Sequence, residues 1–198
     1  MCHRIWYTKY ALERACWKFG LVQEIEPLAR GTINPSDLAV IIAGRDRRFS
    51  LQEARWGFAG KEGGLVINAR CESIFAKPMF SSSALYRRCA VPAETFYEWD
   101  PAKNKVGFQQ KDGELMYLAG LWRPAQEAEG PGEDGLRFVV ITAPANASVA
   151  NVHDRMPLLL SESETRAWIF DVDAARELLK KPLPDLVQLR DEEQLSLF

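Results

Sequence analysis

The sequence predicts an α+β fold: a single, strand-rich domain with a curved, barrel-like mixed sheet and a few flanking helices. Short segments rich in β-branched and apolar residues recur along the chain, and clusters of turn-forming residues separate them. Strands and helices do not alternate with the period of a β-α-β protein. The 198 residues, 47% of them hydrophobic, are enough for one domain with a substantial core.

Several segments fit the strand pattern of apolar and β-branched residues bounded by turns. They are residues 38–42, 65–70, 88–93, 95–99, 117–122 and 138–142. The sequence Asp112-Gly113 supplies the positive φ angles that a type I′ turn needs. We therefore expect a tight β-hairpin between residues 105–110 and 115–122.

Helical patterns are fewer and lie near the two ends of the chain. Residues 7–19 place apolar side chains on one helical face, and residues 171–181 open with acidic residues. Residues 161–170 begin with Ser161 followed by Glu164, the pattern of a capping box. Beyond these helices the chain becomes polar, so we assign residues 1–184 to the domain and 185–198 to a C-terminal tail.

The charge balance constrains the partners of the protein. A formal net charge of −2 argues against non-specific coating of duplex DNA, for which proteins are usually basic. Many arginines in the first four-fifths of the chain leave a local basic groove open. The arginine-rich segment at residues 44–50 is by itself typical of a solvated turn.

The cysteine and histidine content predicts neither a metal site nor a cofactor. The four cysteines are scattered without a C-x-x-C pair, and only two histidines are present. No apolar run approaches the ~20 residues of a membrane span, and the start of the chain lacks a signal-peptide pattern. We expect a cytoplasmic protein with reduced thiols and no membrane partner.

The first candidate site residue is Cys2, which directly follows Met1. If Met1 is removed, Cys2 presents an α-amine and a thiol on adjacent carbons, a pair of nucleophiles that an internal cysteine lacks. The ordinary alternative is a frayed chain end, where a cysteine has no role.

Four further candidate residues, in three clusters, lie in apolar, strand-like surroundings. Asn68 and Arg70 alternate along a strand, so their side chains project from one face. Glu98 lies among aromatic residues, where a carboxylate is either paired or suited to proton transfer. His153 follows an apolar strand. Each has a structural alternative: a turn cap, a surface ion pair, the exposed side of a strand and a core histidine, respectively. Together with Cys2 they supply the parts of an active site.

An ordered set of motifs connects these residues to a known family. The segments "MC.R" at the start, "WGF" before "INAR.E", then "FYEW" and "VITAPAN" before "VHDRMPLLL" resemble the SRAP family, the SOS-response-associated peptidase domain. The resemblance spans roughly residues 1–170.

The resemblance implies a DNA-damage activity. Met1 would be removed, with autocatalysis expected, although ordinary methionine processing also accepts a small second residue. Cys2 would then crosslink covalently to abasic sites in single-stranded DNA: its amine condenses with the sugar aldehyde, and its thiol closes a thiazolidine. Asn68 would orient Cys2, Glu98 would exchange protons at the amine, and His153 would move the proton that opens the sugar ring.

The resemblance also implies DNA contacts and shows departures from the family. The expected DNA-binding residues are Arg4, Arg70 and Arg155 at the phosphates, with Pro35, Trp56 and Lys61 nearby. His3 stands where the family commonly has glycine, and Ile5 stands where it has an aromatic residue. His3 lies beside the nucleophile, so we expect altered reactivity.

The chain ends in "QLSLF", which resembles the peptide by which bacterial replication proteins dock on the sliding β-clamp. Its expected clamp-binding residues are Gln194, Leu195, Leu197 and Phe198. The alternative is that these apolar side chains pack on their own domain.

Two other functions stay open at this point. One is a cysteine peptidase or amidohydrolase that uses Cys2, Glu98 and His153. The other is a passive module that binds single-stranded DNA through arginines and aromatic residues. For the abasic-site function we expect a monomer acting in the cytoplasm, at the replication forks of the nucleoid.

Overall fold

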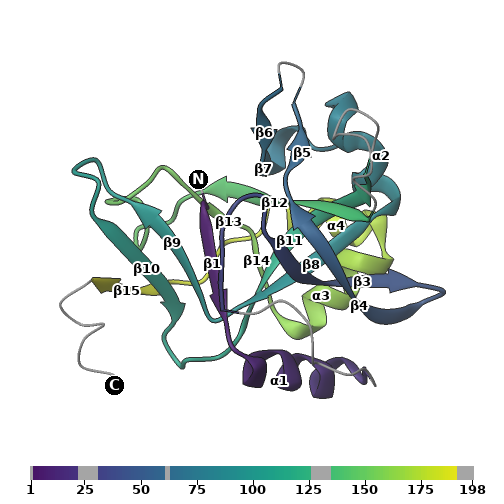
Figure 1. Ribbon diagram of the computed structural model, residues 1–198, viewed down its shortest axis with the longest axis horizontal. Coiled ribbons are helices and arrows are strands. Elements are labelled where there is room, and N and C mark those ends of the chain that lie inside the picture. The colour runs from purple at the N-terminus through teal and green to yellow at the C-terminus, as the bar shows by residue number, and fades with distance from the viewer. Residues whose placement is uncertain (1, 22–30, 61–62, 126–134, 191–198) are drawn as a thin grey trace.

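A computed structural model describes residues 2–21, 31–60, 63–125 and 135–190. The strands form two larger sheets and one small hairpin (Figure 1). The five-stranded sheet has the order β15 (Leu186–Arg190), β10 (Lys105–Gln110), β9 (Thr95–Trp99), β1 (Arg4–Tyr7) and β2 (Gly31–Ile33). The eight-stranded sheet has the order β13 (Arg155–Pro157), β12 (Leu136–Pro144), β4 (Arg48–Trp56), β3 (Leu38–Arg45), β8 (Arg88–Ala93), β11 (Met116–Pro124) and β14 (Leu159–Leu160), with β7 (Asn68–Arg70) also on β12.

The larger sheet closes on itself. Strand β12 pairs in parallel with β4 at one edge and antiparallel with β11 at the other. Because β4, β3, β8 and β11 are paired in succession, this second contact of β12 completes a ring. The predicted strand-rich α+β fold with a barrel-like mixed sheet is therefore confirmed. The described β5 (Phe58–Ala59) and β6 (Leu65–Val66) form the small hairpin.

One continuous run of chain connects the two sheets. Strand β8 of the ring leads through Glu94 directly into β9 of the five-stranded sheet. The Glu94 carboxylate accepts a hydrogen bond from the Thr8 amide at 2.6 Å, and its own amide donates to the Trp6 carbonyl at 3.0 Å. These bonds hold β1 against β9, so the beginning of the chain lies at the side of the ring.

Helices cover the outside of the sheets (Figure 1). They are α1 (Lys9–Phe19), η1 (Cys71–Ser73), α2 (Pro78–Tyr86), α3 (Glu162–Phe170) and α4 (Val172–Leu178). The predicted capping box of α3 is present, with Ser161 and Glu164 exchanging both bonds. The α2 helix was not predicted, because "PMFSSSALY" has no one-sided apolar pattern; Pro78 begins it.

Buried Arg88 fixes α2 and α3 to the ring. Its guanidinium donates to the carbonyls of Ala84 and Leu85 at the end of α2, and to those of Trp168 and Ile169 at the end of α3. Such carbonyls have no partner within their own helix, so a buried arginine satisfies several at once.

The predicted hairpin at Asp112-Gly113 is wrong in its pairing. The turn itself is present, with a φ of +68° at Gly113 and a bond from its amide to the Gln110 carbonyl at 3.1 Å. However, β10 pairs with β9 and β15, whereas β11 pairs with β8, β12 and β14. Both edges of β10 are already occupied, so the turn leads from one sheet to the other.

The predicted boundary between domain and tail is also wrong. Residues 186–190 form β15, which pairs antiparallel with β10 from Gln110↔Leu186 to Val106↔Arg190. Leu186 is only 5% exposed, so the polar-looking segment contributes to the core. The domain therefore extends at least to Arg190.

The arginine-rich segment at residues 44–50 is a solvated turn, as predicted. Asp46 and Arg47 adopt φ angles of +50° and +58° between β3 and β4, and Arg45 lies opposite Arg48. All four side chains are exposed at the tip of the hairpin.

Candidate active site

Cys2 is buried at the junction between the two sheets. Its exposed fraction is 0%, and its thiol donates to the Arg4 carbonyl at 3.8 Å. The side-chain amide of Asn68 donates to the Cys2 carbonyl at 2.9 Å. Asn68 belongs to β7, which is fixed on β12 by the parallel register Val140↔Asn68. The predicted orientation of Cys2 by Asn68 thus has a direct hydrogen bond behind it.

The other atom of the Asn68 amide is an available acceptor. Its Oδ1 is buried and accepts no hydrogen bond from any residue that the structure describes. Buried amide oxygens normally accept at least one hydrogen bond. Asn68 therefore offers Cys2 a second interaction through Oδ1, in addition to the hydrogen bond that Nδ2 already donates to the Cys2 carbonyl.

Glu98 is placed at the site by the alternation of β9. Phe96 and Glu98 face the interior, and Tyr97 and Trp99 lie on the other, partly exposed side. The Glu98 side chain is only 1% exposed, so the alternative of a solvent-facing strand carboxylate is wrong. Its Oε2 lies 3.8 Å from Nδ1 of His3.

The local environment keeps the Cys2 thiol protonated. Burial raises the pKa of Cys2 well above its ordinary value, and the negative charge of Glu98 raises it further. The positive charge of the chain terminus acts in the opposite direction. A thiol in this setting needs a base to become a nucleophile, and Glu98 is the nearby carboxylate.

Two of the predicted DNA contacts lie on the accessible side of this site. Arg70 is exposed at the end of β7, two residues after Asn68. Arg4 is partly exposed; its Nε donates to Oδ1 of Asn34 at 3.0 Å, and its guanidinium lies 5.2 Å from the centre of the Trp99 ring. Pro35 follows Asn34 and is partly buried.

The structure corrects the expectation that Arg155 holds a DNA phosphate. The Arg155 side chain is 11% exposed and forms a bidentate ion pair with Glu72, at 2.5 and 2.9 Å. One Nη also donates to the Thr142 carbonyl at 2.6 Å. Arg155 therefore joins β13 to η1 across β12.

The structure also corrects Trp56 as a DNA-binding residue. Trp56 is 0% exposed, its ring stacks on Phe138 with centroids 5.9 Å apart, and its Nε1 donates to the Ile67 carbonyl at 2.9 Å. Trp56 packs where the chain enters and leaves the β5–β6 hairpin, so its ring cannot stack on a nucleobase. Lys61 and the four predicted clamp-binding residues lie outside the described residues.

His153 lies in the turn before β13, and its side chain is 28% exposed. Nδ1 accepts a hydrogen bond from the Arg155 amide at 2.9 Å, so the neutral ring carries its proton on Nε2. Nδ1 is also 2.8 Å from Asp154, whose side chain is 84% exposed. A doubly protonated ring would thus have a carboxylate acceptor. The structure brings Cys2, Asn68 and Glu98 into one cluster. The contacts of His153 given above are instead with its chain neighbours Asp154 and Arg155.

Sequence reasoning missed two neighbours of the cluster. Asn34 was not singled out, and only the three-dimensional contact with Arg4 reveals it. Trp99 was not singled out either, and it is partly exposed beside Arg4. The alternation with buried Glu98 is the sequence signal that could have placed Trp99 on the outer side.

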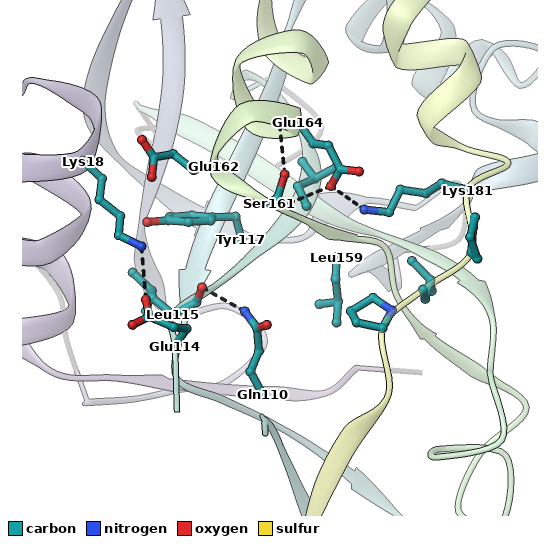
Figure 2. A pocket seen from close by; sticks show the side chains of 14 residues that line it. Lys18, Gln110, Glu114, Leu115, Tyr117, Leu159, Ser161, Glu162, Glu164 and Lys181 are labelled. Atoms are coloured by element: carbon teal, nitrogen blue, oxygen red, sulfur yellow. Dashed lines mark hydrogen bonds and ion pairs between the residues drawn. The ribbon is translucent and has the colours of Figure 1, made fainter. Parts of the chain in front are cut away.

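A large hollow in the surface is separate from this cluster. It has a volume of about 660 Å³ and opens between α1, the turn after β10 and the start of α3 (Figure 2). Its lysines pair with its carboxylates, Lys18 with Glu114 and Lys181 with Glu164. None of the predicted catalytic residues lines it.

The described ranges contain neither a metal-binding cluster nor a membrane-spanning helix. No group of three or more histidine, cysteine, aspartate or glutamate side chains there is arranged to hold a metal ion. Likewise, no helix in those ranges combines the length and apolar character of a membrane span.

The ring-closed fold and the buried N-terminal cysteine cluster agree with a match to known proteins. The model of the family described as SOS response associated peptidase (SRAP) matches residues 1–195, and the chain belongs to this family. The protein is similar to abasic site processing protein YoqW of Bacillus subtilis, with 32% identity over 142 residues. That alignment covers 67% of this chain and 62% of YoqW, less than two thirds of the relative's length.

Other relatives and solved structures extend the comparison. Abasic site processing protein YedK of Escherichia coli is 27% identical over 149 residues, covering 73% of this chain and 66% of YedK. A crystal structure of a protein from Bordetella bronchiseptica superposes with a TM-score of 0.78 at 21% identity, covering 96% of this chain and 99% of that one. The structural likeness establishes the shared fold.

Proposed function

We propose that this protein captures abasic sites in single-stranded DNA as a covalent crosslink through Cys2, after Met1 has been removed. Two lines of support meet here. Relatives in the family are named abasic site processing proteins. In this chain, the only residue that could offer an adjacent amine and thiol is buried against an amide and a carboxylate.

The hydrogen bond from Asn68 to the Cys2 carbonyl is the observation that carries this proposal. It fixes the backbone of a residue at the start of the chain, where fraying is normal. Oδ1 of the same amide is buried without a hydrogen-bond donor among the described residues. Removal of Met1 converts the Cys2 nitrogen into an amine, whose N–H groups can donate a hydrogen bond to Asn68 Oδ1.

The proposed chemistry uses the amine first and the thiol second. The amine adds to the aldehyde of the ring-opened sugar, water leaves, and an imine forms; the sulfur then adds to the imine carbon to close the thiazolidine. Imine formation releases the aldehyde oxygen as water together with both hydrogens of the neutral amine. Because the Cys2 thiol is protonated, Glu98 accepts its proton during ring closure and returns it to the ring nitrogen.

The remaining residues act on the DNA. His153 is proposed to move the proton that opens the sugar ring, giving it up from Nε2 of the doubly protonated ring while Asp154 accepts a hydrogen bond from Nδ1. Exposed Arg70 and partly exposed Arg4 are proposed to hold the phosphates next to the lesion. Phosphate contacts position a strand without reading its sequence.

A denaturing gel tests the proposal. Protein with Cys2 at its N-terminus is incubated with single-stranded DNA that contains one abasic site. We expect a shifted band that survives denaturation and disappears in Cys2→Ala. Cys16→Ala is the matched control, because Cys16 is also a buried, free cysteine but lies in α1.

Two other outcomes would replace the proposal. Cleavage of amide substrates without any covalent DNA band would establish a cysteine peptidase or amidohydrolase. DNA binding that is unchanged in Cys2→Ala, again without a covalent band, would establish a passive single-strand-binding module.

Removal of Met1 is proposed to be autocatalytic: the Cys2 sulfur adds to the Met1 carbonyl carbon, the Met1–Cys2 C–N bond breaks as the nitrogen takes up the thiol proton, and water then hydrolyses the thioester to release methionine. The test is synthesis in an extract depleted of methionine aminopeptidase, followed by mass spectrometry. We expect loss of Met1 from the wild-type protein and retention in Glu98→Gln. Complete retention in both proteins would show that cellular processing performs this step.

We also propose that the C-terminal "QLSLF" docks on the bacterial sliding clamp, which would bring a monomeric protein to cytoplasmic replication forks. The support is the sequence alone, because residues 191–198 lie outside the described part of the chain. Deletion of residues 194–198 should abolish binding to immobilised clamp. Undiminished binding would contradict the docking, and light scattering would check the monomer.

A further inference from the structure

His3 lies directly beside the buried carboxylate of the candidate active site. In the β1–β9 register Arg4 is opposite Tyr97, so one residue further back His3 is opposite Glu98. Side chains of directly opposite residues lie on the same face of a sheet. The distance of 3.8 Å between His3 Nδ1 and Glu98 Oε2 agrees with this placement.

The two side chains differ sharply in their access to water. The His3 side chain is 49% exposed, whereas that of Glu98 is 1% exposed. The His3 ring is held edge-on to Trp99, with the ring centres 6.4 Å apart at an angle of 80°. His3 therefore connects an enclosed carboxylate to the solvent.

Charged groups of both signs lie near His3. Glu98 on β9 lies 3.8 Å from its Nδ1, and Arg4 on the same strand lies 5.2 Å from the ring centre of Trp99, which His3 also contacts. Cys2 contributes its neutral thiol and, once Met1 is removed, its α-amine. Histidine is the side chain that changes charge in the range of about pH 5 to 8.

Crosslink formation needs such a connection. When the Cys2 amine begins as an ammonium group, one proton must leave the site for the solvent before nitrogen can attack. Water formed with the imine takes up the aldehyde oxygen and the two hydrogens of the neutral amine, and the S–H proton moves to the ring nitrogen, so neither step takes up that extra proton. Glu98 can accept it, but burial prevents Glu98 from releasing it directly to bulk water.

We propose that His3 is a positioning residue that acts through Glu98, passing protons between the Cys2 site and the solvent. This inference rests on the crosslinking function proposed above. A bridging water or a small rotation of the exposed ring spans the 3.8 Å between the two groups. This chain has His3 where the family commonly has glycine, and His3 places a second proton-exchanging side chain beside Glu98.

The test measures single-turnover crosslinking rates between about pH 5.5 and 8.5, where histidine titrates. Wild type, His3→Gly and His3→Gln are each released from a fusion so that Cys2 is the N-terminal residue, and circular dichroism confirms folding. We expect both variants to be about 5- to 20-fold slower, less than the effect of a direct acid or base, and to have a flatter pH profile. Added imidazole should accelerate His3→Gly but not His3→Gln, whose side chain fills the space.

The outcomes separate the two proposals. If the wild type forms the Cys2-dependent crosslink and both variants match its rate and pH profile, the role of His3 is overturned and the proposed function stands. A slower rate with an unchanged profile and no response to imidazole also overturns it, because His3 would then only support the structure. If the wild type forms no crosslink, the proposed function fails and the inference fails with it.

Discussion

At the residue scale, the nitrogen and the oxygen of the Asn68 side-chain amide define the site. Asn68 Nδ2 fixes the Cys2 carbonyl at 2.9 Å, while its buried Oδ1 accepts no bond from the described residues. An unsatisfied buried acceptor costs stability, and such costs are often found where a ligand or reacting group will be bound. The arrangement is consistent with a site completed by an amine that appears only after processing.

The first prediction concerns this amide. Asn68→Ala removes both the donor to Cys2 and the buried acceptor, so we expect crosslinking to be at least about 10-fold slower, an effect typical of lost orientation. Single-turnover gel kinetics measure it. Gln52→Ala is the matched control, since Gln52 is an exposed amide on β4. Equal rates for Asn68→Ala and wild type would contradict the role of Asn68.

The second prediction concerns acid stability. The hydrogen bonds from Arg155 lower the pKa of Glu72 to about 2, so their stabilisation is present above the ordinary glutamate pKa and is lost as pH falls toward 2. Glu72 is 51% exposed, so we expect Glu72→Gln to cost only about 1 kcal/mol at pH 7.

Urea unfolding at several pH values measures this effect. The difference between Glu72→Gln and wild type should narrow below about pH 4.5, the ordinary glutamate range. Glu177→Gln is the control, because Glu177 forms an exposed ion pair with Lys180 and is 75% exposed. A pH-independent difference would show that Arg155 stabilises the fold without Glu72 ionisation.

The candidate role of an individual residue was predictable where the chemistry of its side chain, rather than its burial, decided that role. Cys2, Asn68 and Glu98 were identified from their type and spacing, and the structure brings them together. Trp56 and Arg155 were misassigned because an aromatic ring or a guanidinium can serve either the core or DNA. Only the three-dimensional partners, Ile67 for Trp56 and Glu72 for Arg155, separate those roles.

At the element scale, the edge strand β15 decides where the domain ends. It stands just before a run of charged residues in the sequence, but Leu186 is 5% exposed while neighbouring Val187 is 41% exposed. This alternation is the signature of a strand with one buried face. The sequence pattern is too short to show it, because only a few side chains of β15 reach the core.

The third prediction uses this contrast. Leu186→Ala should lower the free energy of unfolding by about 2 kcal/mol, since a buried leucine is truncated, while Val187→Ala should change it by less than about 0.5 kcal/mol. Chemical denaturation followed by tryptophan fluorescence measures both. Equal, negligible effects would mean that residues 186–190 are detached from the domain in solution.

Turns were easier to predict than the partners of the strands that flank them. Gly113 adopts the expected positive φ, and the Asp46-Arg47 turn is solvated as expected. The pairing of β10 and β11 was wrong because turn chemistry acts over a few residues, whereas sheet membership depends on which edges are already filled. Helix α2 escaped prediction since its start depends on Pro78 and its burial on neighbours far away in sequence.

At the scale of the whole molecule, polar contacts help to join the two sheets. One is the Tyr7 hydroxyl of β1, which accepts a hydrogen bond from the Val40 amide of β3 at 2.8 Å. Tyr7 is 0% exposed, and burial raises the pKa of its hydroxyl far above the ordinary value. The hydroxyl therefore stays neutral around pH 7, with its oxygen accepting the bond.

The fourth prediction follows from this contact. Tyr7→Phe keeps the ring but leaves the buried Val40 amide without its acceptor, so we expect a loss of about 1 to 3 kcal/mol in unfolding free energy. Thermal and urea unfolding measure it. Tyr10→Phe is the matched control, because Tyr10 is 65% exposed. If both variants unfold alike, the contact does not stabilise the junction of the sheets.

The two ends of the β5–β6 segment are bonded to β12, which lets the segment between them vary. The Gly57 amide donates to the Phe138 carbonyl at 2.7 Å, and the Val140 amide donates to the Ile67 carbonyl at 3.1 Å, so both ends of the excursion are anchored on β12. Exposed residues between those anchors, such as Leu65, can be exchanged without shifting Asn68, which follows the second anchor. Under the proposed function, this segment is where the fit to DNA beside the lesion can change while Cys2, Asn68 and Glu98 stay in place.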